Sequence, residues 1–214
     1  MIKEIRICVI AFLLAFLTIG FCIPSQSQGM IYVSNFSDGT VTVFPLNADN
    51  NVAPTSTISY SGSPYLGNPA GIAVDASWIY VADDHSNSIL VFPIDANGDV
   101  APTRRIFCSS FQHLAGIAVD ANWIYVVEVF SPPQVMIFPI DADGTVTPSR
   151  QISGTNTTFL GPYKIAVDAS WMYVADVFAS RIDVFPVDGN GNIAPTRWIT
   201  SGLDAPTAID IDAK

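Results

Sequence analysis

Short apolar runs alternate with polar turns along residues 31–212, and the whole pattern repeats. An aromatic and β-branched run begins at Ile31, Ile79, Ile124 and Met172, so the spacings are 48, 45 and 48 residues. Each is followed by a run ending in Phe-Pro, a run after a proline turn, and a run ending in aspartate. Short β-branched and aromatic runs bounded by turn residues are typical of strands. The pattern therefore predicts four repeats of about 47 residues, each with four antiparallel strands.

The turn segments agree with this interpretation. DANGD, DADGT and DGNGN each contain an Asn-Gly or Asp-Gly pair, the strongest local signal for a β-hairpin. No helical periodicity follows residue 30, and four strands in every 45–48 residues are typical of a β-propeller blade. The sequence thus predicts an all-β fold, a four-bladed β-propeller over residues 28–214. Its repeat units start near residues 31, 79, 124 and 172.

The order of the runs also predicts how the ring closes. The last run, AIDID at residues 208–212, resembles the innermost strand, whereas the first repeat begins with its second strand at residues 31–34. We expect these two segments to pair and complete one blade, because ring closure removes two open sheet edges. A half-ring that dimerises into eight blades also fits the whole number of repeats. Both a monomer and a homodimer therefore stay open.

The repeated strings YVAD, VFP, GNIAPTR and GIAVD resemble NHL-type repeats and the related bacterial lactonase-like β-propeller proteins. The resemblance extends over residues 31–212 and implies the propeller fold. What it implies for activity is broad, because this superfamily includes hydrolases, lyases and binding modules.

The first 27 residues have a different character. Lys3 and Arg6 precede an apolar run over residues 7–23, and small residues follow at Ser25 and Ser27. This is the pattern of a secretory signal peptide, so we expect residues 1–27 to be removed and the protein to be secreted or periplasmic. The apolar run is long for a signal peptide, and the alternative is an uncleaved membrane anchor.

Composition narrows the class of partner. The formal net charge is −10, and only 13% of the residues are charged. Nucleic acids and anionic membrane surfaces are bound by Lys and Arg patches, so neither is expected as a partner beyond the export step. A cation or a neutral ligand fits better. Loss of the leader would leave Cys108 as the one cysteine, so no intramolecular disulfide is expected.

Residues that recur in every repeat are explained by the architecture. Aspartate recurs at the turn after the innermost strand, at Asp75, Asp120, Asp168 and Asp212. There it is expected to cap the turn's own backbone. Arginine recurs on the outermost strand, at Arg104, Arg150 and Arg197. A charge at that edge is expected to discourage edge-to-edge pairing.

An acidic or amide side chain also recurs at the end of the second strand, at Asn35, Asp83, Glu128 and Asp176. Ring closure would place equivalent residues at equal distances from the axis, and oxygen ligands of this type suit Ca²⁺. One interpretation is therefore a metal site built from these four residues, with Ca²⁺ as the candidate cofactor. The alternative is that each side chain caps the backbone of its own loop.

Residues that break the repeat are the candidates for ligand binding. His85 and His113 lie in connections predicted at one end of the ring. Lys164 and Asp210 replace small residues of the innermost strands, and period-two alternation turns both toward the centre. Tyr163, beside Lys164, completes this candidate set. A structural ion pair between Lys164 and Asp210 is the alternative to a ligand-binding role.

Two classes of function fit these features. The first is an exported binding or scaffold module that recognises a small ligand, a glycan or a protein at its loop-rich face. The neutral loops, which contain several aromatic residues, favour this class. The second is a metal-dependent, lactonase-like hydrolase, in which a central cation polarises an ester carbonyl. A structural spacer is a third interpretation, and none of the three follows from the fold alone.

Overall fold

A computed structural model of the chain describes residues 29–130 and 132–212. These residues form four β-sheets and one short 3-10 helix, η1, over Thr155–Thr157. The predicted signal peptide, residues 1–27, lies outside the described residues. Among the residues that are described, no helix has the length and apolar character needed to cross a membrane.

Each sheet is formed mainly by one repeat. In the first sheet the order is β1–β2–β3–β7, over Met30–Asn35, Thr40–Pro45, Ser56–Ser59 and Gly98–Asp99. In the second sheet the order is β4–β5–β6–β8–β12, over Pro69–Val74, Trp78–Asp83, Ser88–Pro93, Arg104–Phe107 and Gly144–Thr145. In the third sheet the order is β9–β10–β11–β13, over Leu114–Val119, Trp123–Glu128, Gln134–Pro139 and Arg150–Ser153. In the fourth sheet the order is β14–β15–β16–β17, over Pro162–Val167, Trp171–Asp176, Arg181–Pro186 and Arg197–Ile199.

The principal strands of each sheet pair antiparallel in chain order. In the second sheet, for example, Ile79 of β5 lies opposite Val74 on one side and Phe92 on the other. The prediction of an all-β fold with one sheet for each repeat is therefore confirmed. Four such sheets are consistent with a four-bladed propeller.

The turns after the innermost strands are capped as the repeat pattern predicts. Asp75 accepts hydrogen bonds at Oδ1 from the backbone N–H groups of Ser77 and Trp78, at 2.7 and 2.8 Å. The Tyr80 hydroxyl donates to Oδ2 of the same aspartate at 2.8 Å. Asp120 and Asp168 make the same three contacts in the next two sheets.

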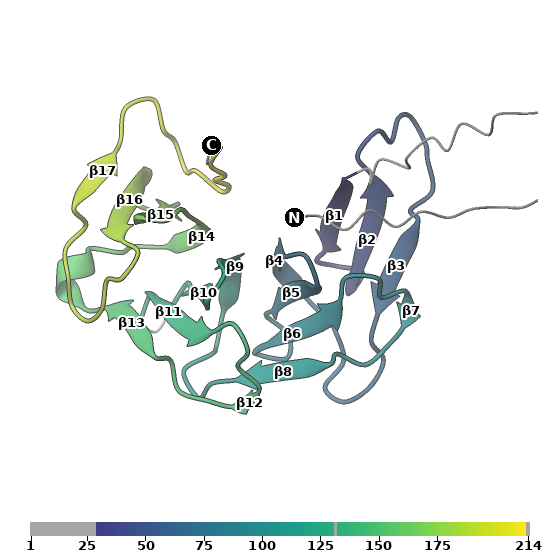
Figure 1. Cartoon of the computed structure of the whole chain (residues 1–214). Helices are drawn as coiled ribbons and strands as arrows, with labels where there is room; N and C mark the ends of the chain where they lie inside the picture. Colours follow the sequence, from purple (N-terminus) through teal and green to yellow (C-terminus); the bar gives the residue numbers. More distant parts are fainter. Residues whose placement is uncertain (1–28, 131, 213–214) are drawn as a thin grey trace, which may run out of the picture.

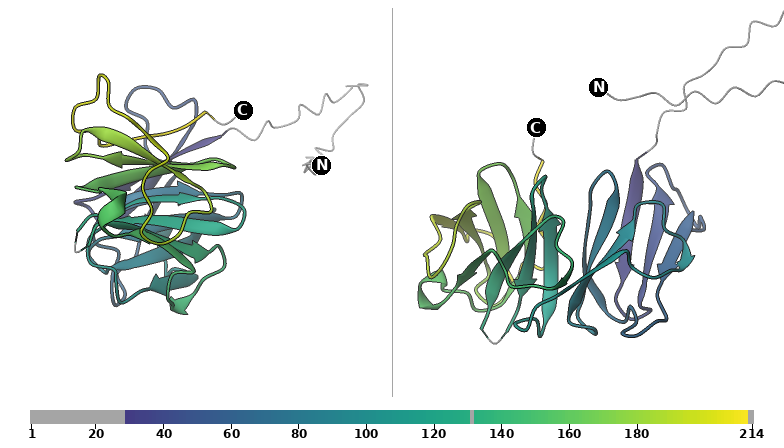
Figure 2. Two further views of the ribbon diagram at one scale, coloured as in Figure 1. Left: turned by 90° about the vertical axis from the view of Figure 1, so that its left-hand side faces the viewer. Right: turned by 60° about the horizontal axis from the view of Figure 1, so that its bottom comes forward.

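The four sheets follow one another around an arc (Figure 1). The strands β4, β9 and β14 lie on its inner side, and the first and fourth sheets lie at opposite ends of the molecule (Figure 2, right). The hydrophobic cores lie between successive sheets, where Phe92, Phe138 and Phe185 are fully buried. The free thiol of Cys108 is buried in the core between the second and third sheets.

Two contacts to the backbone of the outer strand recur where one sheet meets the next. The hairpin of the later repeat adds a short parallel pairing to the outer strand of the earlier sheet, at Ile58–Gly98, Ile106–Gly144 and Ile152–Gly191. An Asn or Asp of the same hairpin also accepts a hydrogen bond from a backbone N–H of that strand. The acceptors are Asn97, Asp143 and Asn190, and the donors are Thr57, Arg105 and Gln151.

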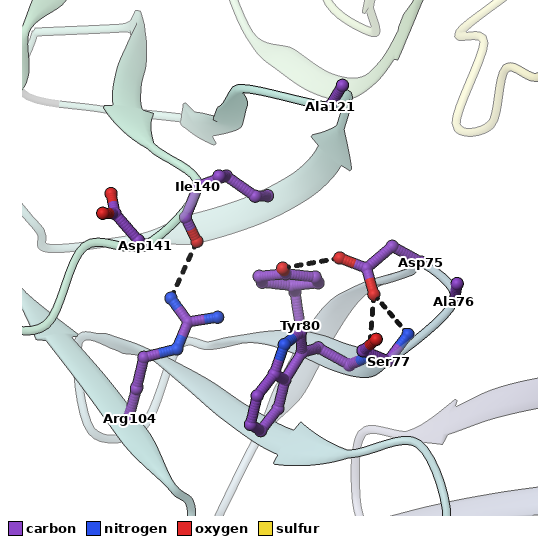
Figure 3. A pocket seen from close by; sticks show the side chains of 9 residues that line it. Asp75, Ala76, Ser77, Tyr80, Arg104, Ala121, Ile140 and Asp141 are labelled. Atoms are coloured by element: carbon purple, nitrogen blue, oxygen red, sulfur yellow. Dashed lines mark hydrogen bonds between the residues drawn. The ribbon is translucent and has the colours of Figure 1, made fainter.

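Arginine supplies the third recurring contact. The Arg104 guanidinium lies 5.3 Å from the Trp78 ring centroid and donates to the Ile140 carbonyl of the next sheet at 2.7 Å (Figure 3). Arg150 does the same with Trp123 and with the Val187 carbonyl, at 2.6 Å. These arginines therefore join neighbouring sheets, which differs from the edge-protecting role predicted from the sequence. The planar guanidinium can stack and donate at once, and this explains the choice of arginine.

The closing strand predicted at residues 208–212 is not formed in the described residues. The segment Ala208–Ile211 belongs to no sheet, and β1 pairs only with β2 there. Ile209 packs instead against the fourth sheet, on the buried cluster formed by Ala175, Ile182 and Val184. The arc consequently has an opening between the first and fourth sheets (Figure 1).

Candidate ligand-binding face

Three buried carboxylates fasten the connections at one end of the molecule. Glu128, at the end of β10, is fully buried. It accepts hydrogen bonds from the backbone N–H groups of Gln112 and His113 at 2.8 Å, and from that of Phe130 at 3.4 Å. One carboxylate thus joins the connection that leads into β9 to the connection that follows β10. We call the end of the molecule formed by these connections the loop face.

Asp83 and Asp176 repeat this arrangement in the second and fourth sheets. Their backbone donors are Gly67, Asn68 and Ser86 for Asp83, and Leu160, Gly161 and Ala179 for Asp176. Both side chains are fully buried, and a buried carboxylate is tolerated when several N–H groups donate to it. The geometry of these acids is therefore that of side chains that cap the backbone of their own loops, the alternative to a metal site in the sequence analysis.

Asn35 differs from its three counterparts. Its Nδ2 donates to the hydroxyl oxygens of Thr40 and Thr42, both at 3.1 Å. In the described structure no inner strand lies beside β1, so no incoming connection lies there for Asn35 to fasten. The amide side chain is therefore used within its own hairpin.

The structure does not bring the four predicted calcium ligands together. Asn35, Asp83, Glu128 and Asp176 end strands of four different sheets, and the three acids are occupied by backbone donors of their own loops. Across residues 29–130 and 132–212, no group of three or more His, Cys, Asp or Glu side chains has an arrangement that could hold a metal ion.

Aromatic rings recur on the loop face, two residues after each capping acid. At this position the chain has His85, Phe130 and Phe178. Phe130 stacks against Phe178 at a centroid distance of 6.4 Å, and His113 meets the Phe130 ring edge-on at 5.5 Å. His85 packs against Tyr65 at 4.3 Å. Phe178 is 62% exposed, Tyr65 47% and Phe130 45%, so the rings are available to a ligand.

Asp84 and His113 connect the two groups of rings. The Asp84 carboxylate lies 3.8 Å from Nδ1 of His113, and the His113 side chain is 55% exposed. Burial raises the pKa of Asp84, while a neighbouring His113 charge would lower it. Together Tyr65, His85, Asp84, His113, Phe130 and Phe178 form one row across three sheets, which we call the aromatic row. Both histidines predicted from the sequence lie in it.

The other three predicted residues lie near the centre of the arc. A cavity of about 530 Å³ lies among β1, β4, β9, β14 and residues 208–211, and Ser34, Lys164 and Asp210 are among the residues that line it. Lys164 donates from Nζ to the Ala70 carbonyl of β4 at 2.5 Å, and burial lowers its pKa. Asp210 is exposed and accepts from the backbone N–H of Ile211. Within the described residues the two make no ion pair. Tyr163 is 39% exposed, with its ring 5.7 Å from Lys164 Nζ.

A second cavity lies at the opposite end, between the second and third sheets. It has a volume of about 500 Å³ and is lined by the capped turn at Asp75, by Tyr80 and by Arg104 (Figure 3). Each of these side chains already takes part in a turn cap or an inter-sheet contact. The cavity is therefore explained by the junction of two sheets.

The aromatic row was not predicted as a unit. The sequence indicated aromatic residues in the loops, but not that three rings share one repeat position. The signal was present in the strings DDH, EVF and DVF, where the ring follows the capping acid by two residues. Tyr65 carries no such signal, because only the fold brings its loop beside His85.

No protein-family model matches the chain, and no curated protein sequence matches it. The structure is similar to a Bacteroides uniformis protein provisionally named 6-phosphogluconolactonase. That similarity has a TM-score of 0.60 and 19% sequence identity, and covers 88% of this chain and 59% of that one. A protein of unknown function from Desulfotomaculum acetoxidans gives a TM-score of 0.57 at 17% identity, over 86% of this chain and 60% of that one.

Hydrazine synthase from Kuenenia stuttgartiensis gives a TM-score of 0.49 at 18% identity, over 65% of this chain and 37% of that one. This similarity is too low to support a conclusion about the present chain. The chain spans about three fifths of the length of the first two structures. At these identities the similarity concerns the fold alone, a propeller fold shared with a lactonase-like protein.

Proposed function

We propose that this protein is an exported β-propeller module that binds a neutral ligand, best represented by a glycan, along the aromatic row. The observation that carries the proposal is the recurrence of a ring two residues after each capping acid, with Phe130 45% and Phe178 62% exposed. Exposed apolar groups gathered on one face of a soluble protein are typical of interaction sites.

The chemistry of the row favours a sugar over an ion. Flat aromatic faces pack against the C–H faces of pyranose rings, while His85, His113 and Asp84 offer polar atoms to hydroxyl groups. The three buried carboxylates are fully engaged by backbone N–H groups and hold the loops that present the rings. The net charge of −10 disfavours a polyanionic ligand.

Titration calorimetry with cellotetraose and chitotetraose tests this proposal. Phe130→Ala and Phe178→Ala should each weaken binding about tenfold, which corresponds to about 1.4 kcal/mol. Val52→Ala is the matched control, because Val52 is 44% exposed but lies outside the aromatic row. Unchanged affinity in both ring variants, or no binding of either sugar, would contradict the proposal.

A lactonase-like hydrolase is the second candidate. It is favoured by the name of the Bacteroides uniformis structure and by the Asp84–His113 pair, which could accept a proton from water. Within the described residues, no group of three or more His, Cys, Asp or Glu side chains could hold the Ca²⁺ that such a reaction would use. Lactone hydrolysis that depends on added calcium and is lost in His113→Ala would favour this candidate over the binding module.

The finer details of the fold belong to the same proposal. We infer that the four sheets are blades of the NHL type and that β1 gains its missing inner strand when a segment 208–211, of the same chain or of a second copy, pairs antiparallel with it. The register of β5 with β4 predicts Val33 opposite Ile209 and Ser34 opposite Ala208. Export through cleavage near Ser27 completes this picture.

A further inference from the structure

Three junctions between sheets in this chain are built from the same parts. Each has the parallel pairing of an outer-strand isoleucine and the side-chain acceptor described above, and two of the three have the arginine. The isoleucines Ile58, Ile106 and Ile152 are fully buried as a result. The isoleucine, the side-chain acceptor and the arginine therefore identify a junction, even at a sheet that has no neighbour on that side.

The fourth sheet ends in an unmatched half-junction, which we call the C-terminal end face and define by Arg197, Trp198 and Ile199. Ile199 is the repeat equivalent of Ile106 and Ile152, but it is 50% exposed, and Trp198 is 59% exposed. The Arg197 guanidinium lies 5.1 Å from the Trp171 ring centroid, as in the other junctions. Within the described residues it donates to no carbonyl of a next sheet.

The first sheet ends in the opposite half-junction, the N-terminal end face, defined by Ile31, Val33, Leu46, Asp49 and Asn50. Leu46 is the equivalent of Ile140 and Val187, whose carbonyls accept from arginine, and it is 65% exposed. Ile31 and Val33 are 39% and 38% exposed, whereas their equivalents in β5, β10 and β15 are fully buried.

The acceptor of this half-junction is unmatched as well. Asp49 is the equivalent of Asn97, Asp143 and Asn190, yet among the described residues its carboxylate accepts only from the neighbouring Asn50. By analogy with the other junctions, the Asp49 carboxylate is placed to accept a hydrogen bond from the backbone N–H of a Trp198 docked against it. Asn50 has φ 57°, the left-handed conformation of the glycines at the other junctions. The two end faces are therefore complementary.

The curvature of the arc keeps the two end faces of one chain apart. The opening lies between them (Figure 1), and Ile209 holds the segment 208–211 against the fourth sheet. Ile31, Leu46, Trp198 and Ile199 consequently stay exposed at the two ends of the arc. The complement of each end face is available on a second copy of the chain.

We propose that a second copy of this chain completes the ring. The C-terminal end face of each copy docks on the N-terminal end face of the other, so Arg197 reaches the Leu46 carbonyl and Ile199 pairs with Asn50 of the second copy. A two-fold axis relates the copies, and the head-to-tail contact closes after two chains. Each copy also covers the open edge of β1 in the other with its segment 208–211.

Cysteine cross-linking tests the contact directly. In full-length chains with Cys8 and Cys22 replaced by serine, Asn50→Cys and Ile199→Cys are prepared separately and mixed, then treated with a short bismaleimide. The proposal predicts a covalent dimer in the mixture and none in either variant alone. A chain that carries both substitutions should give the covalent dimer. Cross-linked monomer from that chain would mean a ring closed by four blades, and no product at all would mean that the faces never meet. Either result overturns the proposal.

The mass in solution gives the second readout. The unmodified chain should sediment with twice the mass of one copy, and Ile199→Glu should raise the dissociation constant at least tenfold. Val74→Glu is the matched control, because Val74 is 40% exposed and belongs to β4 of the second sheet, which contributes to neither end face. Circular dichroism confirms that each variant is folded. A monomer at every concentration, or equal loss of dimer in both variants, would overturn the proposal.

Discussion

Buried carboxylates show how strongly the surroundings of a single residue decide its role. Glu128 accepts hydrogen bonds from the backbone N–H groups of the loops that it joins. Asp183, also fully buried, has Arg181 as its partner at 2.7 Å, and no hydrogen bond from the described part of the chain reaches its second oxygen. Burial raises the pKa of Asp183 to about 6, and the hydrogen bond from Arg181 opposes this shift. Ionisation of Asp183 therefore opposes folding.

The substitution Asp183→Asn should stabilise the protein at neutral and higher pH. The raised pKa means that Asp183 contributes stability fully below pH 3.8 and loses it as the pH rises through about 6. The asparagine keeps an oxygen for the Arg181 Nε–H and never ionises. Relative to the variant, the parent's free energy of unfolding should fall by roughly 2 kcal/mol between pH 4 and pH 8. Urea unfolding at each pH measures this difference, and a difference that is constant with pH would contradict the account.

At the scale of the element, the strand–loop units act as the repeated parts of the fold. Each capping acid stands at the end of a middle strand and holds two connections in place. The substitution Glu128→Gln exchanges one acceptor oxygen for an N–H₂ group that faces backbone donors. It should lower the free energy of unfolding by about 1–3 kcal/mol, equally with and without millimolar calcium.

Thermal unfolding of the parent and of Glu128→Gln, each with calcium and with a chelator, makes the measurement. Glu128→Asp is the conservative control, because it keeps both oxygens and shortens the side chain. A rise in the melting temperature of the parent with calcium, abolished by Glu128→Gln, would restore the calcium interpretation.

The sequence predicts elements where the determining contacts are local. Asp75 caps a turn two and three residues away, and its repeats predicted that role correctly. Arg104 was harder, because its acceptor Ile140 lies 36 residues further along the chain. The partnership of Tyr65 with His85 likewise depends on how the loops meet in space. The opening of the arc follows from the angle between sheets, which no local pattern encodes.

At the scale of the whole molecule, the repeats separate two kinds of surface. The end faces carry the parts of an unfinished junction, and the loop face carries the aromatic row. Residues that recur in every repeat, such as the turn aspartates, build the sheets. Side chains that recur with a change of type, such as His85, Phe130 and Phe178, give the loop face its chemistry.

The central claim, that the loop face is the binding surface, is tested most directly by hydrogen–deuterium exchange of the full chain with and without cellotetraose. We predict slower exchange in the connections that follow β5, β10 and β15 and in those that lead into β4 and β9. The capped turns at Asp75, Asp120 and Asp168, at the opposite end, should exchange at unchanged rates. Protection confined to those turns or to the central strands, or no change at saturating sugar, would contradict the account.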